Sequence, residues 1–537
     1  MDTSVIQRRR WIILGVLVVG LLAIVIDNTV LNVALKTIAN PAAGLGASQS
    51  ELEWAINSYT LVFAGLLFTF GVVGDRIGRK RVLTAGLALF GIGSLLSAYS
   101  HSPDQLIAAR AVMGLGGAAV MPQTLSIIAN VFEPRERARA IGIWTAAVGV
   151  GVAIGPVLGG LLLAHFWWGS VFLINVPVTI AGVFAVIFLV PESRNPAPGR
   201  IDFLGVLASV IGLVLVVFGI VQGGDGVSWV SPGVLGPVLG GLAVLALFGW
   251  YESRIEHPSL DVRLFKNRTL SASVGSIALL FFGMGGVYFF SSFYLQNVRG
   301  YSPLFTGMLA MPFALAQFVM APRSASLVSR FGARSVGVVG MLANAVAIAG
   351  WAFLDQSAPI WIIAVLFFVQ GAGLGLAVPT ATASVMQALP RERAGAGSAL
   401  TNTARQVAVA LSVAVLGSIL AQAYRSTLSP TLSALPAAAR SAAGSSITAT
   451  QAVAAQLGPS GRFLLAPADT AFVDAMRITT AIAAAIAVLG AIAVLRWMPG
   501  KRRPTIKEVE EMIAAEVAAA ERDLAAGLPE RPELSER

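Results

Sequence analysis

The sequence contains no cysteine, only three histidines and few charged residues. Without cysteine there is no disulfide framework, iron–sulfur centre, thiolate zinc site or thiol nucleophile, and three histidines offer little for a metal site. Charged residues make up 12% of the 537 positions, about half the fraction typical of soluble domains. Hydrophobic residues make up 56%, and the mean hydropathy is +0.78. These numbers predict a polytopic membrane protein and exclude an ordinary soluble enzyme and a disordered chain.

Apolar runs long enough to cross a bilayer recur along the chain. A membrane-spanning helix needs roughly 20 such residues. The runs lie near residues 12–35, 54–73, 81–100, 104–128, 138–163, 170–191, 202–222, 233–251, 269–294, 304–324, 335–354, 358–386, 397–423 and 474–497. We therefore expect an all-α membrane protein with fourteen transmembrane helices.

Basic residues gather in alternate connections between these runs. One set of connections is rich in arginine and lysine, whereas the short loops of the opposite set hold only Lys36 and Arg299. By the positive-inside rule this asymmetry predicts that both termini lie in the cytoplasm. It also explains the net charge of +10 without a nucleic-acid partner.

The chain repeats itself with an offset near 256 residues, the distance from Pro134 to Pro390. Three matches occur in the same order: Pro134–Ala138 with Pro390–Ala394, Asp75–Lys80 with Ser329–Arg334, and Gly114-Leu-Gly116 with Gly373-Leu-Gly375. Parallel repeats of this kind are typical of transporters that work by alternating access, with the site between the repeats.

The repeat divides the chain into six spans, two inserted spans and six more. We expect an N-terminal bundle at 1–191, the two inserted helices with their flanking loops at 192–264, and a C-terminal bundle at 265–497. Residues 424–473 are expected to form an extracytoplasmic loop within the last bundle. A cytoplasmic tail follows at 498–537, with an amphipathic helix near 504–526.

Only three ionisable residues lie deep inside the predicted spans: Asp27, Arg110 and Arg405. Such residues are costly in a bilayer and are functional candidates by default. Asp27 lies roughly 22 Å from the cytoplasmic face and Arg110 roughly 9 Å from the opposite face, at 1.5 Å per residue. In a core of about 30 Å the two reach a similar depth. If they meet, Asp27 carries the proton and Arg110 modulates it; the alternative is a static ion pair.

A charged loop follows the second span. Asp75 is expected to bond nearby arginines and to latch the cytoplasmic side closed, although the basic residues also suit a role in topology alone. The gate candidates are Gly71, Asp75, Arg76, Gly78, Arg79 and Lys80.

The fifth span is rich in glycine. Gly151, Gly155 and Gly159 are four residues apart and share one helix face, while Pro156 removes a backbone hydrogen bond. With Gly160 they form either a hinge of the transport cycle or a packing seam of small residues.

Polar and aromatic side chains in several spans are candidates for a substrate cavity. Aromatic and methionine surfaces bind varied apolar or cationic ligands, but packing and interhelical hydrogen bonds are the competing interpretations. The candidates are Asn28, Tyr59, Phe289, Phe293, Met311, Phe313, Gln317, Asn402, Arg405 and Gln406.

Together these motifs resemble the major facilitator superfamily, and specifically its fourteen-span drug:proton antiporter family. The resembling segments are Asp27–Leu35, the Gly71–Lys80 loop, Arg110 with Gly114, and the glycine pattern from Gly142 to Gly160. The resemblance implies the major facilitator fold and links the span-4 arginine to proton transfer. Lys36 departs from the pattern, since the family usually has proline there.

These observations predict an antiporter that exports hydrophobic or amphipathic, often cationic, compounds in exchange for protons. We expect no enzyme activity, no cofactor other than the coupling proton, a monomer, and a location in the cytoplasmic (inner) membrane in contact with lipid. A dedicated exporter of one natural product or lipid is the alternative, and a non-transporting membrane sensor is a more remote one.

Overall fold

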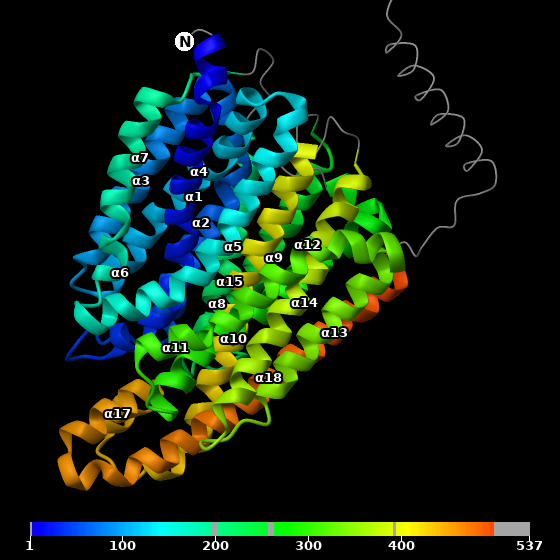
Figure 1. The fold of residues 1–537 in the computed structure, drawn as a ribbon. Coiled ribbons are helices and arrows are strands. Elements are labelled where there is room, and N and C mark those ends of the chain that lie inside the picture. The colour runs from blue at the N-terminus through cyan, green and yellow to red at the C-terminus, as the bar shows by residue number, and fades with distance from the viewer. Residues whose placement is uncertain (1–2, 195–201, 256–261, 390–393, 499–537) are drawn as a thin grey trace, which may run out of the picture.

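The computed structural model describes residues 3–194, 202–255, 262–389 and 394–498, and every regular element within these ranges is a helix (Figure 1). The predicted tail helix near 504–526 lies outside the described residues. The helices up to residue 252 are α1 (Thr3–Ala39), α2 (Gln49–Ile77), α3 (Arg79–Ala98), α4 (Pro103–Val131), α5 (Pro134–His165), α6 (Ser170–Leu173), α7 (Asn175–Leu189), α8 (Phe203–Gly224) and α9 (Pro232–Glu252).

The remaining helices begin at residue 262. They are η1 (Val262–Lys266), α10 (Arg268–Phe293), the π-helical turn η2 (Tyr294–Val298), α11 (Pro303–Leu309), α12 (Met311–Phe331), α13 (Ala333–Trp351), α14 (Ile360–Gln387), α15 (Ala394–Leu432), α16 (Ala437–Ala443), α17 (Ile447–Gln456), η4 (Gly458–Leu464) and α18 (Leu465–Trp497).

The described helices are compatible with fourteen membrane spans. Twelve are long and apolar enough to cross a bilayer. Helix α2 bends by 53° between Leu67 and Thr69 and makes a thirteenth if its two parts form one span. In α5 the apolar stretch Val150–His165 is shorter. All fourteen runs found in the sequence fall on these helices.

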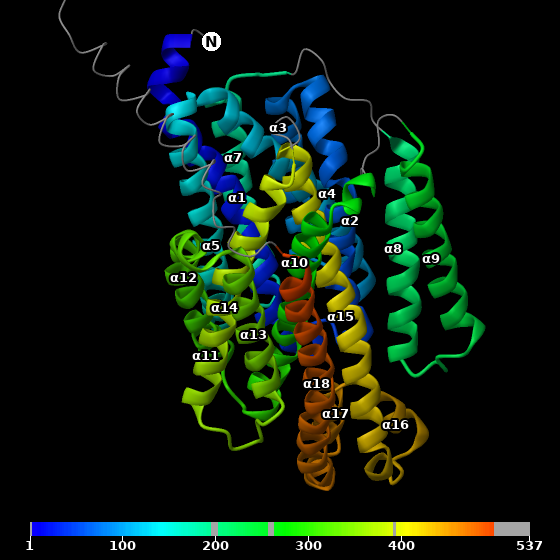
Figure 2. The ribbon, with the colours of Figure 1, turned by 90° about the vertical axis from the view of Figure 1, so that its right-hand side faces the viewer.

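Three packed groups make up the molecule. Helices α1–α7 pack on one another and form the first bundle, and helices α10–α18 form the second bundle. Helices α8 and α9, the inserted pair, pack together at one edge, where α8 touches α2 and α15 (Figure 2). Many apolar side chains of α9 are exposed. An apolar exposed face of this kind suits contact with lipid acyl chains.

The segment 424–473 is not the loop that we expected. Helix α15 continues to Leu432, α18 already starts at Leu465, and α16, α17 and η4 fill most of the interval. The segment is rich in alanine, a strong helix former, but too polar to look like a span. These short helices mark the far end of the molecule, at the bottom of Figure 1. The opposite end, which carries Arg79, is called the basic end.

Two glycine turns at the basic end reflect the repeat. Gly78 joins α2 to α3 with φ 120°, and Gly332 joins α12 to α13 with φ 86°. Residues other than glycine rarely adopt these backbone conformations. The two glycines occupy matching positions in the repeated motifs Asp75–Lys80 and Ser329–Arg334.

Close helix crossings show the register of the repeat. A Cβ on Gly114 would lie 2.5 Å from the Tyr59 carbonyl oxygen, and one on Gly371 would lie 2.0 Å from that of Phe313. Gly116 meets Gly86 in the same way as Gly373 meets Gly340. The sequence alignment of Gly114 with Gly373 is therefore wrong by two residues. Gly373-Leu-Gly375 is the identical match, but Gly371-Ala-Gly373, which shares only the two glycines, is the structural one.

Candidate functional site

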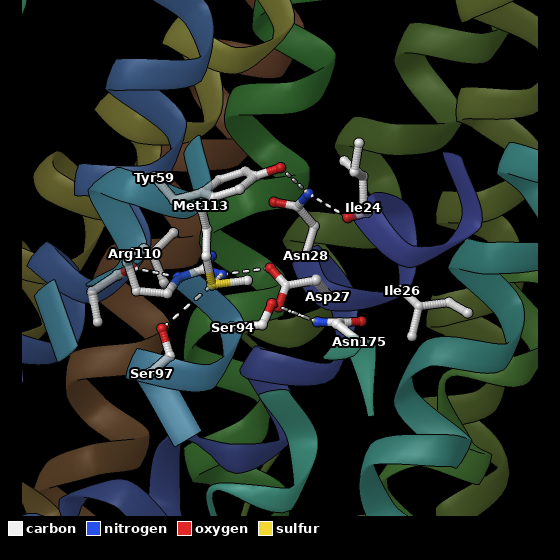
Figure 3. Close-up of polar contacts among 12 residues, drawn as sticks. Ile24, Ile26, Asp27, Asn28, Tyr59, Ser94, Ser97, Arg110, Met113 and Asn175 are labelled. Carbon is white, nitrogen blue, oxygen red and sulfur yellow. Dashed lines mark hydrogen bonds and ion pairs between the residues drawn. The ribbon is translucent and has the colours of Figure 1, made fainter. Parts of the chain in front are cut away.

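Asp27 and Arg110 form a buried ion pair inside the first bundle. Arg110 Nη1 lies 2.5 Å from Asp27 Oδ2, and each side chain is 1% exposed. The pair joins α1 to α4 across a span interior (Figure 3). In so apolar a setting each charge depends on the other, because removal of one partner leaves an uncompensated buried charge.

An aromatic and sulfur cage surrounds the guanidinium. Arg110 Nε donates to the Ala55 carbonyl at 3.1 Å, and Nη1 lies 3.7 Å from Met113 Sδ. The Tyr59 ring lies 4.4 Å from Arg110 Cζ, within cation–π range. The cage therefore links α2 to the α1–α4 pair.

Asn175 is a third member of the Asp27–Arg110 site. It is not among the site residues predicted from the sequence. Its Nδ2 donates to Asp27 Oδ1 at 3.1 Å, so both carboxylate oxygens accept a hydrogen bond. Asn175 begins α7 and is 2% exposed. A single asparagine is uncharged, so it does not stand out in the sequence as the ionisable residues inside the spans do. Asn28, one position after Asp27, donates to the Tyr59 hydroxyl at 3.1 Å.

At the basic end, the predicted gate residues gather around the turn between α2 and α3. Arg79 donates to Asp75 Oδ1 from Nε at 3.0 Å and from Nη2 at 2.7 Å. Its Nη1 reaches the Ser126 carbonyl of α4 at 3.4 Å. Lys80 Nζ donates to the Ile187 carbonyl of α7 at 2.6 Å. Arg76 lies in the last turn of α2, and Gly71 lies one turn before Asp75 on the same helix.

Glu192 belongs to the same cluster but was not predicted. Its Oε1 accepts from the backbone N–H of Lys80 at 3.1 Å, and its carboxylate lies 3.6 Å from Arg81. A Cβ on Gly78 would lie 2.6 Å from this carboxylate. The turn between α2 and α3 is thus held against the chain that follows α7.

The glycines of α5 face two different neighbours. Cβ atoms on Gly151, Gly155 and Gly159 would meet side chains of α1 at 2.8, 1.8 and 3.0 Å, so this face packs within the first bundle. Gly160 instead meets Leu304 of the second bundle, where a Cβ would lie 2.4 Å from the leucine Cα. The carbonyl oxygen of Pro156 meets Gly307 in the same region.

Further contacts join the two bundles toward the far end. Lys36 Nζ donates to the Gln296 carbonyl, and Gln296 Nε2 donates to the Val33 carbonyl at 2.9 Å. The lysine that departs from the family pattern therefore bridges α1 to the π-helical turn η2.

A small, narrow pocket lies between the bundles. Its wall comes from α1, α5, α10, η2, α11 and α14, with Ala310 between α11 and α12. The lining residues are Thr29, Asn32, Val33, Pro156, Tyr288, Ser291, Ser292, Leu295, Thr306, Ala310 and Phe367. Of the predicted site residues only Pro156 is among them, although Tyr288 stacks edge-on against the candidate Phe313 at 5.4 Å.

The other cavity candidates are spread along the second bundle. Phe289 and Phe293 are each 1% exposed and pack against each other at 5.6 Å. Arg405 lies over the Phe281 ring at 5.4 Å. Met311 is 49% exposed. Gln317 packs by its backbone against Gly375, while Asn402 and Gln406 are partly buried on α15.

A family model described as Major Facilitator Superfamily matches residues 17–413. The chain belongs to the Major Facilitator Superfamily. It is therefore a multi-pass membrane transporter and not an enzyme.

The relatives below align with most of the length of this superfamily member. It is 34% identical over 496 residues to the multidrug efflux pump LfrA of Mycolicibacterium smegmatis, with 92% of this chain and 97% of the relative covered. It is 34% identical to the methyl viologen resistance protein SmvA of Salmonella typhimurium, over 78% of this chain and 84% of the relative. It is 33% identical to a tetracenomycin C resistance and export protein of Streptomyces glaucescens, over 78% and 77%.

Solved transporters share the fold of the superfamily member. An inward-facing bacterial homolog of the lysosomal transporter Spinster gives a TM-score of 0.64 at 18% identity, with 92% of this chain and 99% of that chain covered. An auto-inhibited peptide transporter of the POT family gives 0.62 at 14% identity, with 92% and 99% covered.

Proposed function

We propose that the protein exports hydrophobic or amphipathic, often cationic, compounds across the cytoplasmic membrane in exchange for protons. Relatives named as a multidrug efflux pump and a methyl viologen resistance protein, each 34% identical, support the substrate class. No cofactor beyond the proton is needed, because an electrochemical gradient drives the cycle.

The proposed orientation puts the basic end in the cytoplasm and the far end outside. The excess of arginine and lysine in the connections at the basic end supports it, with both termini on that side. The contacts of Lys36 with Gln296 and of Gly160 with Leu304 then close the outer side. Rocking of residues 1–191 against 265–497 opens this side and closes the cytoplasmic one, and the Asp75–Arg79 pair stabilises one of the two states.

The buried Asp27–Arg110 pair is the observation that carries the proposal. Protonation of Asp27 removes the negative charge that compensates Arg110, so the guanidinium must find another partner. Tyr59, Met113 and the Ala55 carbonyl already surround it. Protonation of Asp27 thereby drives a rearrangement of α4 against α1 and α2. Antiport requires this coupling between proton binding and a conformational change.

Inside-out vesicles with an acidified lumen test this proposal. Addition of a panel of unrelated cationic and neutral toxicants is expected to dissipate the proton gradient with wild type and not with Asp27→Asn. Asp104→Asn is the matched control, because Asp104 is exposed at the start of α4 and should leave the response intact.

Gradient dissipation by Asp27→Asn at the wild-type rate would contradict the assignment of Asp27. A response to a single compound of the panel would favour the second candidate, a dedicated exporter. That candidate is supported by the relative named for resistance to and export of tetracenomycin C, which is 33% identical.

A further inference from the structure

Glu53 is a second buried acid, placed at the seam where all three groups of helices meet. It lies near the start of α2 and is 1% exposed. The second predicted span begins at residue 54, so this acid lies one position outside it. The residue takes no part in the Asp27–Arg110 site.

The carboxyl group of Glu53 is pressed against α15. A Cβ on Gly417 would lie 2.3 Å from Glu53 Oε1 and 2.6 Å from Cδ, so only glycine leaves room for the acid. Oε2 is buried and accepts no hydrogen bond among the described residues. The Gln49 side chain, one turn earlier on α2, is close enough to favour the ionised form but brings no positive charge. A buried carboxylate without a cation is costly, and such a group is normally held as the neutral acid.

The inserted pair, α8 and α9, packs against α15 through α8, beside Glu53. Ser418, the neighbour of Gly417, donates to the Ile220 carbonyl of α8 at 3.0 Å. Arg425 donates to the Gly224 carbonyl at 3.1 Å, and Trp229 donates to Gln422 at 2.6 Å. Toward the membrane centre, α2, α8 and α15 share a buried apolar cluster of Leu61, Val217, Val221, Ala410 and Ala414.

The charged groups around Glu53 do not neutralise it. Asp225, on the turn after α8, is close enough for its charge to oppose that of Glu53. Glu51 on α2 itself accepts from Ser48 in a capping box. Arg425 on α15 directs its guanidinium to the backbone carbonyls of Gly224, the last residue of α8, and of Gly444. An ionised Glu53 would therefore add repulsion to a closed seam.

We propose that Glu53 is a proton-binding residue that controls closure of the outer side. Protonated, it is buried between α2 and α15 and the far end stays closed. When the far end opens, the carboxyl group meets the outer solution, loses its proton and resists closure until a proton returns. This inference rests on the proposed outward orientation of the far end and on alternating access.

The absence of cysteine makes this proposal directly testable. Spin labels on Ala42→Cys, in the turn after α1, and on Ser426→Cys, in the last two turns of α15, report the distance across the seam in the full chain in lipid nanodiscs; both residues are exposed. We expect the open population to grow several-fold from acidic to alkaline pH, roughly 5.5 to 8.5. Glu53→Gln, a neutral isostere, is expected to stay closed at both values, whereas the control Glu51→Gln should follow wild type.

The measurement is made in the Asp27→Asn background, which separates the two acids. If the pH response persists in the Asp27→Asn background and is lost when Glu53→Gln is added, the proposal for Glu53 is supported. This conclusion does not depend on the result of the vesicle assay for Asp27. Loss of the response in Asp27→Asn alone, or an unchanged response with Glu53→Gln, overturns the proposal.

A second variant decides the matter should Glu53→Gln not fold. Gly417→Ala places a methyl group against the carboxyl and is expected to raise the open population at acidic pH. The control is Gly275→Ala, where a Cβ meets nothing within 4 Å. Equal open populations for Gly417→Ala and wild type would overturn the proposal as well.

Discussion

At the scale of single residues, the ion pair at the centre of the first bundle is defined by its neighbours as much as by its charges. Depth along the helices was enough to expect Asp27 and Arg110 to meet, because helix geometry fixes the level of a residue in the bilayer. Asn175 and Glu53 needed the tertiary structure. The first is not ionisable, and the second fell one position outside the predicted span.

Removal of the asparagine should destabilise the protein through the carboxylate. Asn175→Leu leaves Asp27 Oδ1 without its donor, and a buried unpaired acceptor costs about 1–3 kcal/mol. We expect a lower midpoint of thermal unfolding in detergent. In the Asp27→Asn background the same substitution should cost clearly less, because the two side chains interact directly. An equal decrease in both backgrounds would contradict a coupling between them.

At the scale of helices, patterns of hydrophobicity located the spans well but said little about neighbours. All fourteen predicted runs fall on helices, whereas the helical segment between α15 and α18 was missed because it is helical without being apolar. The spacing of Gly151, Gly155 and Gly159 indicated a shared face. It did not indicate that this face packs on α1 while Gly160 alone meets the second bundle.

Gly160→Ala should therefore disturb the contact between the bundles and not the first bundle itself. Its Cβ would lie 2.4 Å from Leu304 Cα and 2.6 Å from the Pro303 carbonyl oxygen, and backbone atoms yield little. We expect normal amounts of folded protein, a wider far end by spin-label distances, and transport reduced several-fold. Gly249→Ala on α9, where a Cβ meets nothing within 4 Å, should leave all three unchanged. Loss of folded protein with an unchanged distance would instead indicate a defect within the first bundle.

At the scale of the whole molecule, equivalent helices cross in the same way in the two bundles, but the buried side chains near these crossings differ. The contacts of Gly114 with Tyr59 and of Gly371 with Phe313 set the repeat register, and in that register Arg110 corresponds to Phe367. Phe367 is 2% exposed and packs on Trp351 and Tyr288. The ion pair is thus a property of the first bundle, and the matching place in the second bundle is aromatic. The repeat itself is visible in the sequence, but its register needed the helix crossings.

The predicted arrangement of six, two and six spans has a testable consequence for sidedness. Val230, on the turn between α8 and α9, and Phe353, after α13, are 78% and 85% exposed at the far end, while Ile77 is 51% exposed at the basic end. Because the chain has no cysteine, single cysteines at these positions report accessibility without background. A membrane-impermeant maleimide added to intact cells should label Val230→Cys and Phe353→Cys, and should label Ile77→Cys only after permeabilisation. Labelling of Phe353→Cys without Val230→Cys would mean that the inserted pair does not cross the membrane, and labelling of Ile77→Cys in intact cells would reverse the orientation.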